Sequence, residues 1–167
     1  MNTETTSNLI GDIMKLQSIL DAKPKREILS VSPEASVADA IHTLCEHRVG
    51  ALVVINDDDK TMAGIVSERD LLQCMCAHCH NAAETAAKLV REFMTTDVVV
   101  AAPDEHAHKA LAIMSNHHIR HLPVVNGDRV VGIISIGDLL RELYAEDELK
   151  IHHLSDFLGG TYGLKVY

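Results

Sequence analysis

Two segments of the chain carry a serine and an aspartate at the same spacing, each after an apolar run that starts at a glycine. They are GIVSERDLL from residue 64, with Ser67 and Asp70, and GIISIGDLL from residue 132, with Ser135 and Asp138. We expect each serine at a junction between a strand and a helix, where its hydroxyl and the free N–H groups of the helix can bind a phosphate. Each aspartate can accept hydrogen bonds from both hydroxyls of a ribose. The alternative is that the aspartate only caps its own helix and interacts with the helix dipole.

The two segments belong to a longer internal repeat. The residues VSPEASVADAIHTL from position 31 align with AAPDEHAHKALAIM from position 101, and HRVGALVVIN from position 47 aligns with HHIRHLPVVN from position 117. The second copy is then shorter by two residues in a predicted turn, where changes in length are tolerated. Because several segments recur in the same order, we predict two copies of one structural unit.

Each copy has the pattern of a β-α-β-β-α unit. Ser36 is a suitable N-cap for a helix, Pro103-Asp104 is expected to open the corresponding helix of the second copy, and Asn126-Gly127 is typical of a hairpin turn. The predicted strands are 28–31, 51–55 and 64–67 in the first copy and 98–101, 122–125 and 132–135 in the second, with helices over 37–47 and from residues 70 and 138.

A single copy is too small for a stable core, since roughly 50 residues bury too little surface. We therefore predict an α/β (α+β) fold in which the two copies pack sheet to sheet with pseudo-twofold symmetry, share a core and leave a crevice for a ligand. Amphipathic helices are expected at both ends, over 9–20 and 138–158, and either complete the core or mediate dimerisation. The predicted organisation is an N-terminal helix (1–23), repeat 1 (24–80), a connecting helix (81–93), repeat 2 (94–150) and a C-terminal tail (151–167).

Composition narrows the possible functions. The formal net charge is −9 and the lysines and arginines form no cluster, which disfavours nucleic-acid binding. No apolar stretch is long enough to cross a membrane, and the N-terminus lacks a signal pattern, so we expect a cytoplasmic protein with reduced cysteines. The sequence contains no nucleophile–base pair, no familiar metal motif and no glycine-rich phosphate loop, so we expect no enzyme activity.

The two repeats resemble cystathionine β-synthase (CBS) domains, which pair into a unit called a Bateman module. The resemblance spans residues 24–150, and the segments VREFMTTDVV, IRHLPVV and VVGIISIGDLLRE are similar to those of stand-alone bacterial CBS-pair proteins. It implies a sensor that binds an adenosine-type ligand (AMP, ADP, ATP, NAD or S-adenosylmethionine) and modulates a partner protein in trans. It also implies a homodimer and a ligand site of the form Gly-h-h-Ser/Thr-x-x-Asp, where h is apolar.

The resemblance also implies which residues of this chain contact the ligand. Ser30 corresponds to a position close to the base or ribose, and the segments 49–52 and 119–123 correspond to the strand edge beside the base. Arg69 and Arg120 are the candidates for phosphate contacts, since a guanidinium binds phosphate bidentately; the alternative for each is a solvated surface charge. The predicted ligand-binding residues are Ser30, Val31, Val49, Gly50, Ala51, Ser67, Arg69, Asp70, Val100, Ile119, Arg120, His121, Pro123, Ser135 and Asp138.

The two predicted half-sites differ in their polar residues. The second repeat has Val100 where the first has Ser30, and Ile136-Gly137 where the first has Glu68-Arg69. Conversely, the first repeat has Gly50-Ala51 where the second has Arg120-His121. We therefore expect unequal ligand affinities in the two half-sites.

A cluster of cysteine and histidine residues, CMCAHCH from residue 74, allows a second hypothesis. Cys74, Cys76, Cys79 and His80 are suitable ligands for zinc or another soft metal, so the chain could instead be a redox- or metal-responsive interaction protein. Cys76 to His80 also fits a C-x-x-C-H haem attachment pattern. The simpler interpretation, which we favour, is the end of a helix followed by a loop.

Overall fold

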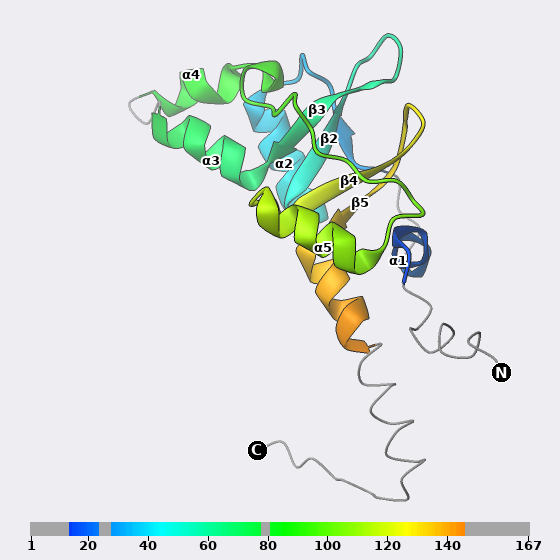
Figure 1. The fold of residues 1–167 in the computed structure, drawn as a ribbon. Helices are drawn as coiled ribbons and strands as arrows, with labels where there is room; N and C mark the ends of the chain where they lie inside the picture. The colour runs from blue at the N-terminus through cyan, green and yellow to red at the C-terminus, as the bar shows by residue number, and fades with distance from the viewer. Residues whose placement is uncertain (1–13, 24–27, 78–80, 146–167) are drawn as a thin grey trace, which may run out of the picture.

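The computed structural model describes residues 14–23, 28–77 and 81–145 (Figure 1). The second helix of repeat 2 occupies residues 136–145 and is called the terminal helix below. The other elements, in chain order, are α1 (Leu16–Ala22), β1 (Ser30–Val31), α2 (Val37–His47), β2 (Ala51–Ile55), β3 (Met62–Ser67), α3 (Glu68–Ala77), α4 (Ala82–Ala87), the 3-10 helix η2 (Val90–Glu92), α5 (Ala107–Asn116), β4 (His121–Asn126) and β5 (Arg129–Ser135).

The strands confirm the predicted β-α-β-β-α order. In repeat 1, β1 pairs in parallel with β2, and β2 forms an antiparallel hairpin with β3. In repeat 2, β4 and β5 form the matching hairpin, which the terminal helix follows. The first strand of repeat 2 is reduced to a single parallel bridge between Ala101 and Val124. None of the described helices has the length and apolar character needed to cross a bilayer.

Local sequence signals explain several element boundaries. The Ser36 side chain accepts a hydrogen bond from the Asp39 N–H, and the Asp39 carboxylate accepts one from the Ser36 N–H, which is a complete capping box at the start of α2. Gly127 has a φ of 62°, as the predicted hairpin turn requires. The corresponding helix α5 begins at Ala107, after the Pro103-Asp104 turn, and its N-cap His106 makes no side-chain cap bond.

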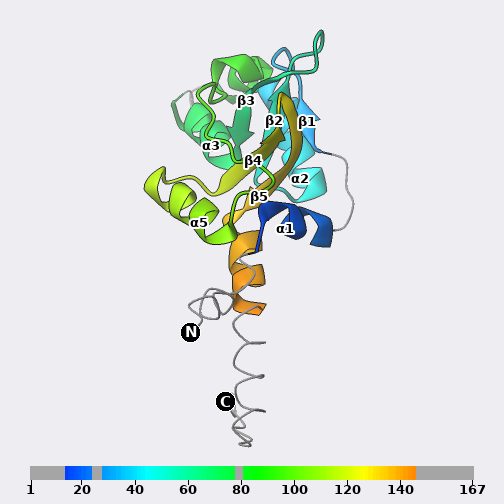
Figure 2. The same cartoon turned by 45° about the vertical axis from the view of Figure 1, so that its right-hand side comes forward.

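The buried residues form two clusters, one for each repeat, where we had expected one shared core. Each cluster is closed by the segment that precedes the other repeat. We call residues 14–23 the first leading segment and residues 88–97 the second. Leu16 and Ile19 of the first are buried among the side chains of repeat 2, and Val90 of the second is buried among those of repeat 1. Figure 2 shows α1 beside β5 of repeat 2, with which it is in contact.

Backbone hydrogen bonds hold each leading segment against the opposite repeat in the same way. Lys15 bridges His106 at the start of α5, and Leu89 bridges Ser36 at the start of α2. Ala107 N–H donates to the Met14 carbonyl, and its counterpart Val37 N–H donates to the Lys88 carbonyl, both at 2.8 Å. The two leading segments are therefore related by the predicted pseudo-twofold symmetry.

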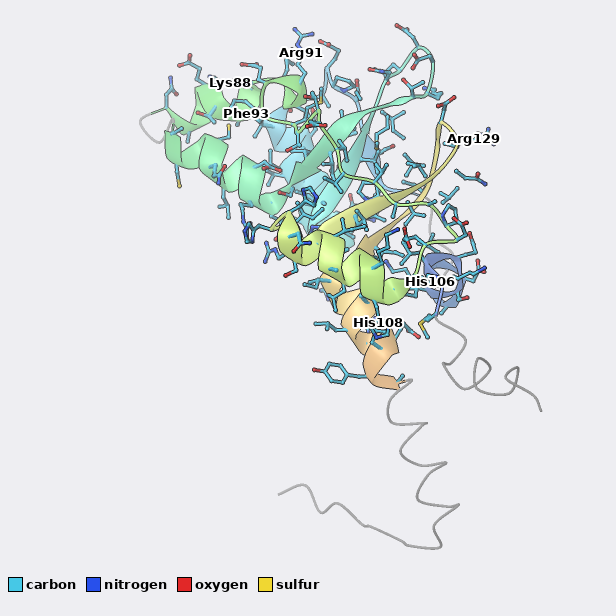
Figure 3. All side chains as sticks on the ribbon, in the orientation of Figure 1. Lys88, Arg91, Phe93, His106, His108 and Arg129 are labelled. Carbon is cyan, nitrogen blue, oxygen red and sulfur yellow. The ribbon has the colours of Figure 1, made fainter. Side chains whose placement is uncertain are left out.

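The connecting segment is not the single helix over 81–93 that we predicted. Helix α4 ends at Ala87, Lys88 and Leu89 are extended, and η2 follows. The break occurs because Leu89 must be extended to pair with Ser36. The Lys88 ammonium lies 5.6 Å from the centre of the Phe93 ring, and Figure 3 shows both side chains beside Arg91 on this segment.

Candidate functional site

The serine and aspartate of each repeat form the same hydrogen-bonded unit at a strand–helix junction. Asp70 Oδ2 accepts bonds from the Ser67 N–H at 2.8 Å and the Ser67 hydroxyl at 2.6 Å, and Asp138 Oδ2 accepts the corresponding bonds from Ser135 at 2.8 and 2.7 Å. Each aspartate therefore does cap the junction, as the structural interpretation predicted.

The first cavity surrounds Ser67 and Asp70 and has a volume of about 230 Å³. It combines the junction of repeat 1 with the first residue of β4 and the residues just before it, from repeat 2, and with part of the second leading segment. We call it the Asp70 cavity. Its lining residues are Ile65, Ser67, Arg69, Asp70, Thr95, Asp97, Val98, Val99, His118, Ile119, Arg120 and His121.

The second cavity surrounds Ser135 and Asp138 and is larger, at about 610 Å³, which is within the usual range for small-molecule sites. It combines the junction of repeat 2 with the start of β2 from repeat 1 and with part of the first leading segment. We call it the Asp138 cavity. Its lining residues are Gln17, Leu20, Asp21, Lys23, Ile28, Leu29, Arg48, Val49, Gly50, Ala51, His121, Val131, Gly132, Ile133, Ser135 and Asp138.

Most of the predicted ligand-binding residues line one of these cavities. Four do not: Ser30 and Val100 are exposed, Val31 packs against the core of repeat 1, and Pro123 is buried within β4, where its carbonyl accepts the Ala101 N–H. These four residues line neither cavity, so whether they contact a ligand stays a prediction. Those that do line a cavity are Ser67, Arg69, Asp70, Ile119, Arg120 and His121 in the first and Val49, Gly50, Ala51, His121, Ser135 and Asp138 in the second.

The sequence analysis missed the leading segments as part of the site. Lys23 Nζ lies 2.7 Å from Asp138 Oδ2 and 2.9 Å from the Ile133 carbonyl oxygen. Asp97 lines the other cavity. Aligning Leu20 with Met94 would have revealed both positions, because Lys23 then aligns with Asp97. The structure supports this alignment: a Cβ on Gly132 would meet Leu20 Cδ2 at 2.6 Å, and one on Gly64 would meet Met94 Sδ at 3.2 Å.

Asp138 is ionised in this environment. Burial opposes its ionisation, but hydrogen bonds from Lys23 and Ser135, together with the Lys23 charge, outweigh burial and lower its pKa. Its Oδ1 lies 3.6 Å from a guanidinium nitrogen of the exposed Arg141. The Asp138 cavity thus contains a charged carboxylate that is already paired with a cation.

His121 is the residue that the two cavities have in common. Its ring lies against Gly50, where an added Cβ would be 2.8 Å from both Cε1 and Nε2. Burial, and then the charge of Arg120, lower the pKa of His121, while Glu68 and Asp138 oppose this shift only in part. The imidazole is therefore neutral at pH 7.

This shift predicts a pH dependence of stability. Because the pKa of His121 is lower in the folded protein, the unfolded chain binds its proton at a higher pH than the folded chain does. The contribution of His121 to the free energy of unfolding is constant at alkaline pH. As the pH drops below about 6.5, the free energy of unfolding falls by at most about 1.4 kcal/mol per pH unit. Urea unfolding between pH 5 and 8 should show that His121→Gln reduces this slope. The exposed His117 provides the control, and equal slopes for His121→Gln and His117→Gln would contradict the prediction.

The cysteine cluster is only partly within the described residues. Cys74 is buried in the core of repeat 1, where burial raises the pKa of its thiol, and Cys76 is exposed. Cys79 and His80 lie outside the described residues. In the described ranges, no three histidine, cysteine or acidic side chains are placed to hold a metal ion together.

Solved structures with the same fold include three with bound adenosine compounds. The chain is 37% identical to a protein with CBS domains from Burkholderia ambifaria MC40-6, with 79% of this chain and 95% of that chain covered and a TM-score of 0.72. A CBS domain protein from Pyrobaculum aerophilum, solved with AMP, is 25% identical, with 79% and 99% covered and a TM-score of 0.65. A CBS domain pair solved with 5′-methylthioadenosine and S-adenosyl-L-methionine is 26% identical, with 80% and 98% covered and a TM-score of 0.67.

The sequence comparison agrees with the internal repeat. Among curated relatives, the chain spans from 22% to 95% of the other protein's length, so similar repeats occur in proteins of very different size. The pattern of the CBS domain matches residues 16–76 and again residues 90–145, and the first match already begins in α1. With this pattern present twice and the fold shared with solved CBS proteins, the chain belongs to the CBS domain family and contains a pair of these domains.

Proposed function

We propose that the chain is a regulatory module that binds an adenosine-type ligand in the two cavities between its repeats. The observation that carries this proposal is that each cavity joins the Ser-Asp junction of one repeat to the start of a strand from the other repeat. A ligand in either cavity therefore contacts both repeats. The AMP and S-adenosylmethionine complexes of relatives support the ligand class, which also includes ADP, ATP and NAD.

In this proposal, different polar residues bind the ribose and the phosphate of the ligand. The Asp70 carboxylate accepts the ribose hydroxyls, and the guanidinium groups of Arg69 and Arg120 bind phosphate in the same cavity. Asp138 has the ribose role in the second cavity, where Arg48 is the nearby arginine. The apolar side chains of Ile65 and Val99 provide a surface for the base in the first cavity.

Regulation follows if the ligand changes how the two repeats pack. A ligand shifts such an equilibrium only by the difference between its affinities for the two arrangements. We propose that the changed arrangement alters binding to a partner protein in trans, in the cytoplasm, with the chain acting as a homodimer and without catalysis of its own.

Titration calorimetry with AMP, ATP, NAD and S-adenosylmethionine tests the proposal. Asp70→Asn and Asp138→Asn keep the shape of the side chain but remove its charge, so each should weaken binding in its own cavity about tenfold. Asp104→Asn, at an exposed position outside both cavities, is the matched control. If none of the four compounds binds at millimolar concentration, or if the double variant binds like the control, the proposal is wrong.

A further inference from the structure

The Asp138 cavity contains a cation supplied by the chain itself. Lys23 Nζ forms an ion pair with Asp138 Oδ2 at 2.7 Å and donates to the Ile133 carbonyl at 2.9 Å. The side chains of Lys23 and Asp138 are 34% and 14% exposed. Asp138 Oδ2 also accepts two bonds from Ser135, so three donors already converge on the carboxylate that we assign to a ribose.

In the described residues, the cations that line the Asp70 cavity, Arg69 and Arg120, form no ion pair with Asp70. Its position equivalent to Lys23 is occupied by Asp97, which has the opposite charge. Within the described part of the chain, Asp70 forms no ion pair, and the bonds it accepts come from Ser67. The two cavities therefore have the same Ser-Asp junction, but in the described residues only the carboxylate of Asp138 also forms an ion pair.

Lys23 also connects this cavity to α1. It is the C-cap of α1, and its backbone N–H donates to the Leu20 carbonyl at 3.2 Å. Leu20 lies directly against Gly132 of β5, which lines the same cavity. Movement of the Lys23 ammonium would therefore act on the end of α1 that contacts β5.

We propose that Lys23 is a built-in competitor for the Asp138 cavity: a ligand's ribose displaces its ammonium from Asp138, and α1 responds to this displacement. This inference rests on the proposed function, because it assumes an adenosine ligand with its ribose at Asp138. Displacement of Lys23 is feasible because its side chain is 34% exposed, so the released ammonium can be hydrated while ribose hydroxyls replace its hydrogen bond to Asp138. Occupancy of this cavity is then reported by the first leading segment, while the described residues of the Asp70 cavity contain no equivalent ion pair between the aspartate and the second leading segment.

The experiment measures AMP binding in the Asp138 cavity alone, by calorimetry on the full chain with Asp70→Asn as the background. Adding Lys23→Met, which keeps the length of the side chain without its charge, should tighten AMP binding roughly fivefold. Lys15→Met is the matched control, since Lys15 lies at the other end of α1, is exposed and lines neither cavity. Hydrogen–deuterium exchange over residues 16–23 supplies the second measurement: AMP should increase exchange in the Asp70→Asn background and not after Lys23→Met.

The outcomes separate this inference from the proposed function. If Lys23→Met leaves AMP affinity unchanged or weakens it, Lys23 is not a competitor, and a weakened affinity would identify it as a phosphate contact. If exchange over residues 16–23 does not depend on AMP, α1 does not report occupancy. If the unmodified chain binds AMP but the Asp70→Asn variant does not, the inference fails, while the proposed function stands for the Asp70 cavity alone. If the unmodified chain binds none of the four compounds, the proposed function itself fails.

Discussion

Replacing Leu16 with alanine is expected to lower the free energy of unfolding by about 2–5 kcal/mol, although Leu16 precedes both repeats in the sequence. Its side chain is fully buried among Ala107, Met114, Leu122 and other residues of repeat 2. The substitution removes apolar contacts from this core and leaves a cavity that the surrounding strands and helices cannot fill. Urea denaturation, followed by circular dichroism, measures the change.

Leu72→Ala is the matched control, because Leu72 is 64% exposed on α3 and should change stability by less than about 0.5 kcal/mol. Equal effects of the two substitutions would mean that α1 is not part of the core of repeat 2. The comparison therefore tests the exchange of leading segments directly, without a ligand.

Replacing Arg120 with glutamate is expected to weaken AMP binding in the Asp70 cavity by about 100-fold. Arg120 is exposed and lines this cavity, so its loss removes charge-assisted hydrogen bonds to phosphate, while the new carboxylate repels phosphate. The affinity for adenosine, which has no phosphate, should fall by less than about threefold. Calorimetry with both compounds, in the Asp138→Asn background, isolates the cavity and separates the effect on phosphate from the effect on ribose and base.

Arg129→Glu changes the net charge by the same amount at the distant end of the β4–β5 hairpin, where Figure 3 labels Arg129. It should leave AMP affinity nearly unchanged at physiological salt, because screening removes most of a long-range effect. If Arg120→Glu weakened adenosine as much as AMP, its effect would be structural and the phosphate assignment of Arg120 would be wrong.

The repeat made much of the fold predictable. Helix α2 has the predicted bounds because Ser36 and Asp39 form the capping box, and the β4–β5 turn follows from Asn126-Gly127. These signals are local, since each depends on residues within one turn of helix or hairpin. The Ser-Asp junctions were predictable for the same reason.

The leading segments were not predictable from such signals. Alignment of the repeats started at residue 31, and the earlier segments have no identical residue at equivalent positions, as Lys23 and Asp97 illustrate. Their placement depends on long-range contacts, such as Leu20 against Gly132, that leave no periodic pattern. The same limit explains Ser30 and Pro123: their strands were identified, but which side of the strand faces a ligand depends on how the two repeats pack.

The exchange of leading segments has a consequence for any attempt to divide the chain. A cut between α3 and α4 would leave Leu16 and Ile19 on the N-terminal fragment. In the intact chain, however, these two residues are buried in the core of repeat 2, which lies on the C-terminal fragment. The C-terminal fragment would keep Val90, which belongs to the core of the N-terminal one. Neither fragment could complete itself, whereas a mixture of the two could restore both cores by complementation. The smallest autonomous unit of this fold is therefore the pair of repeats.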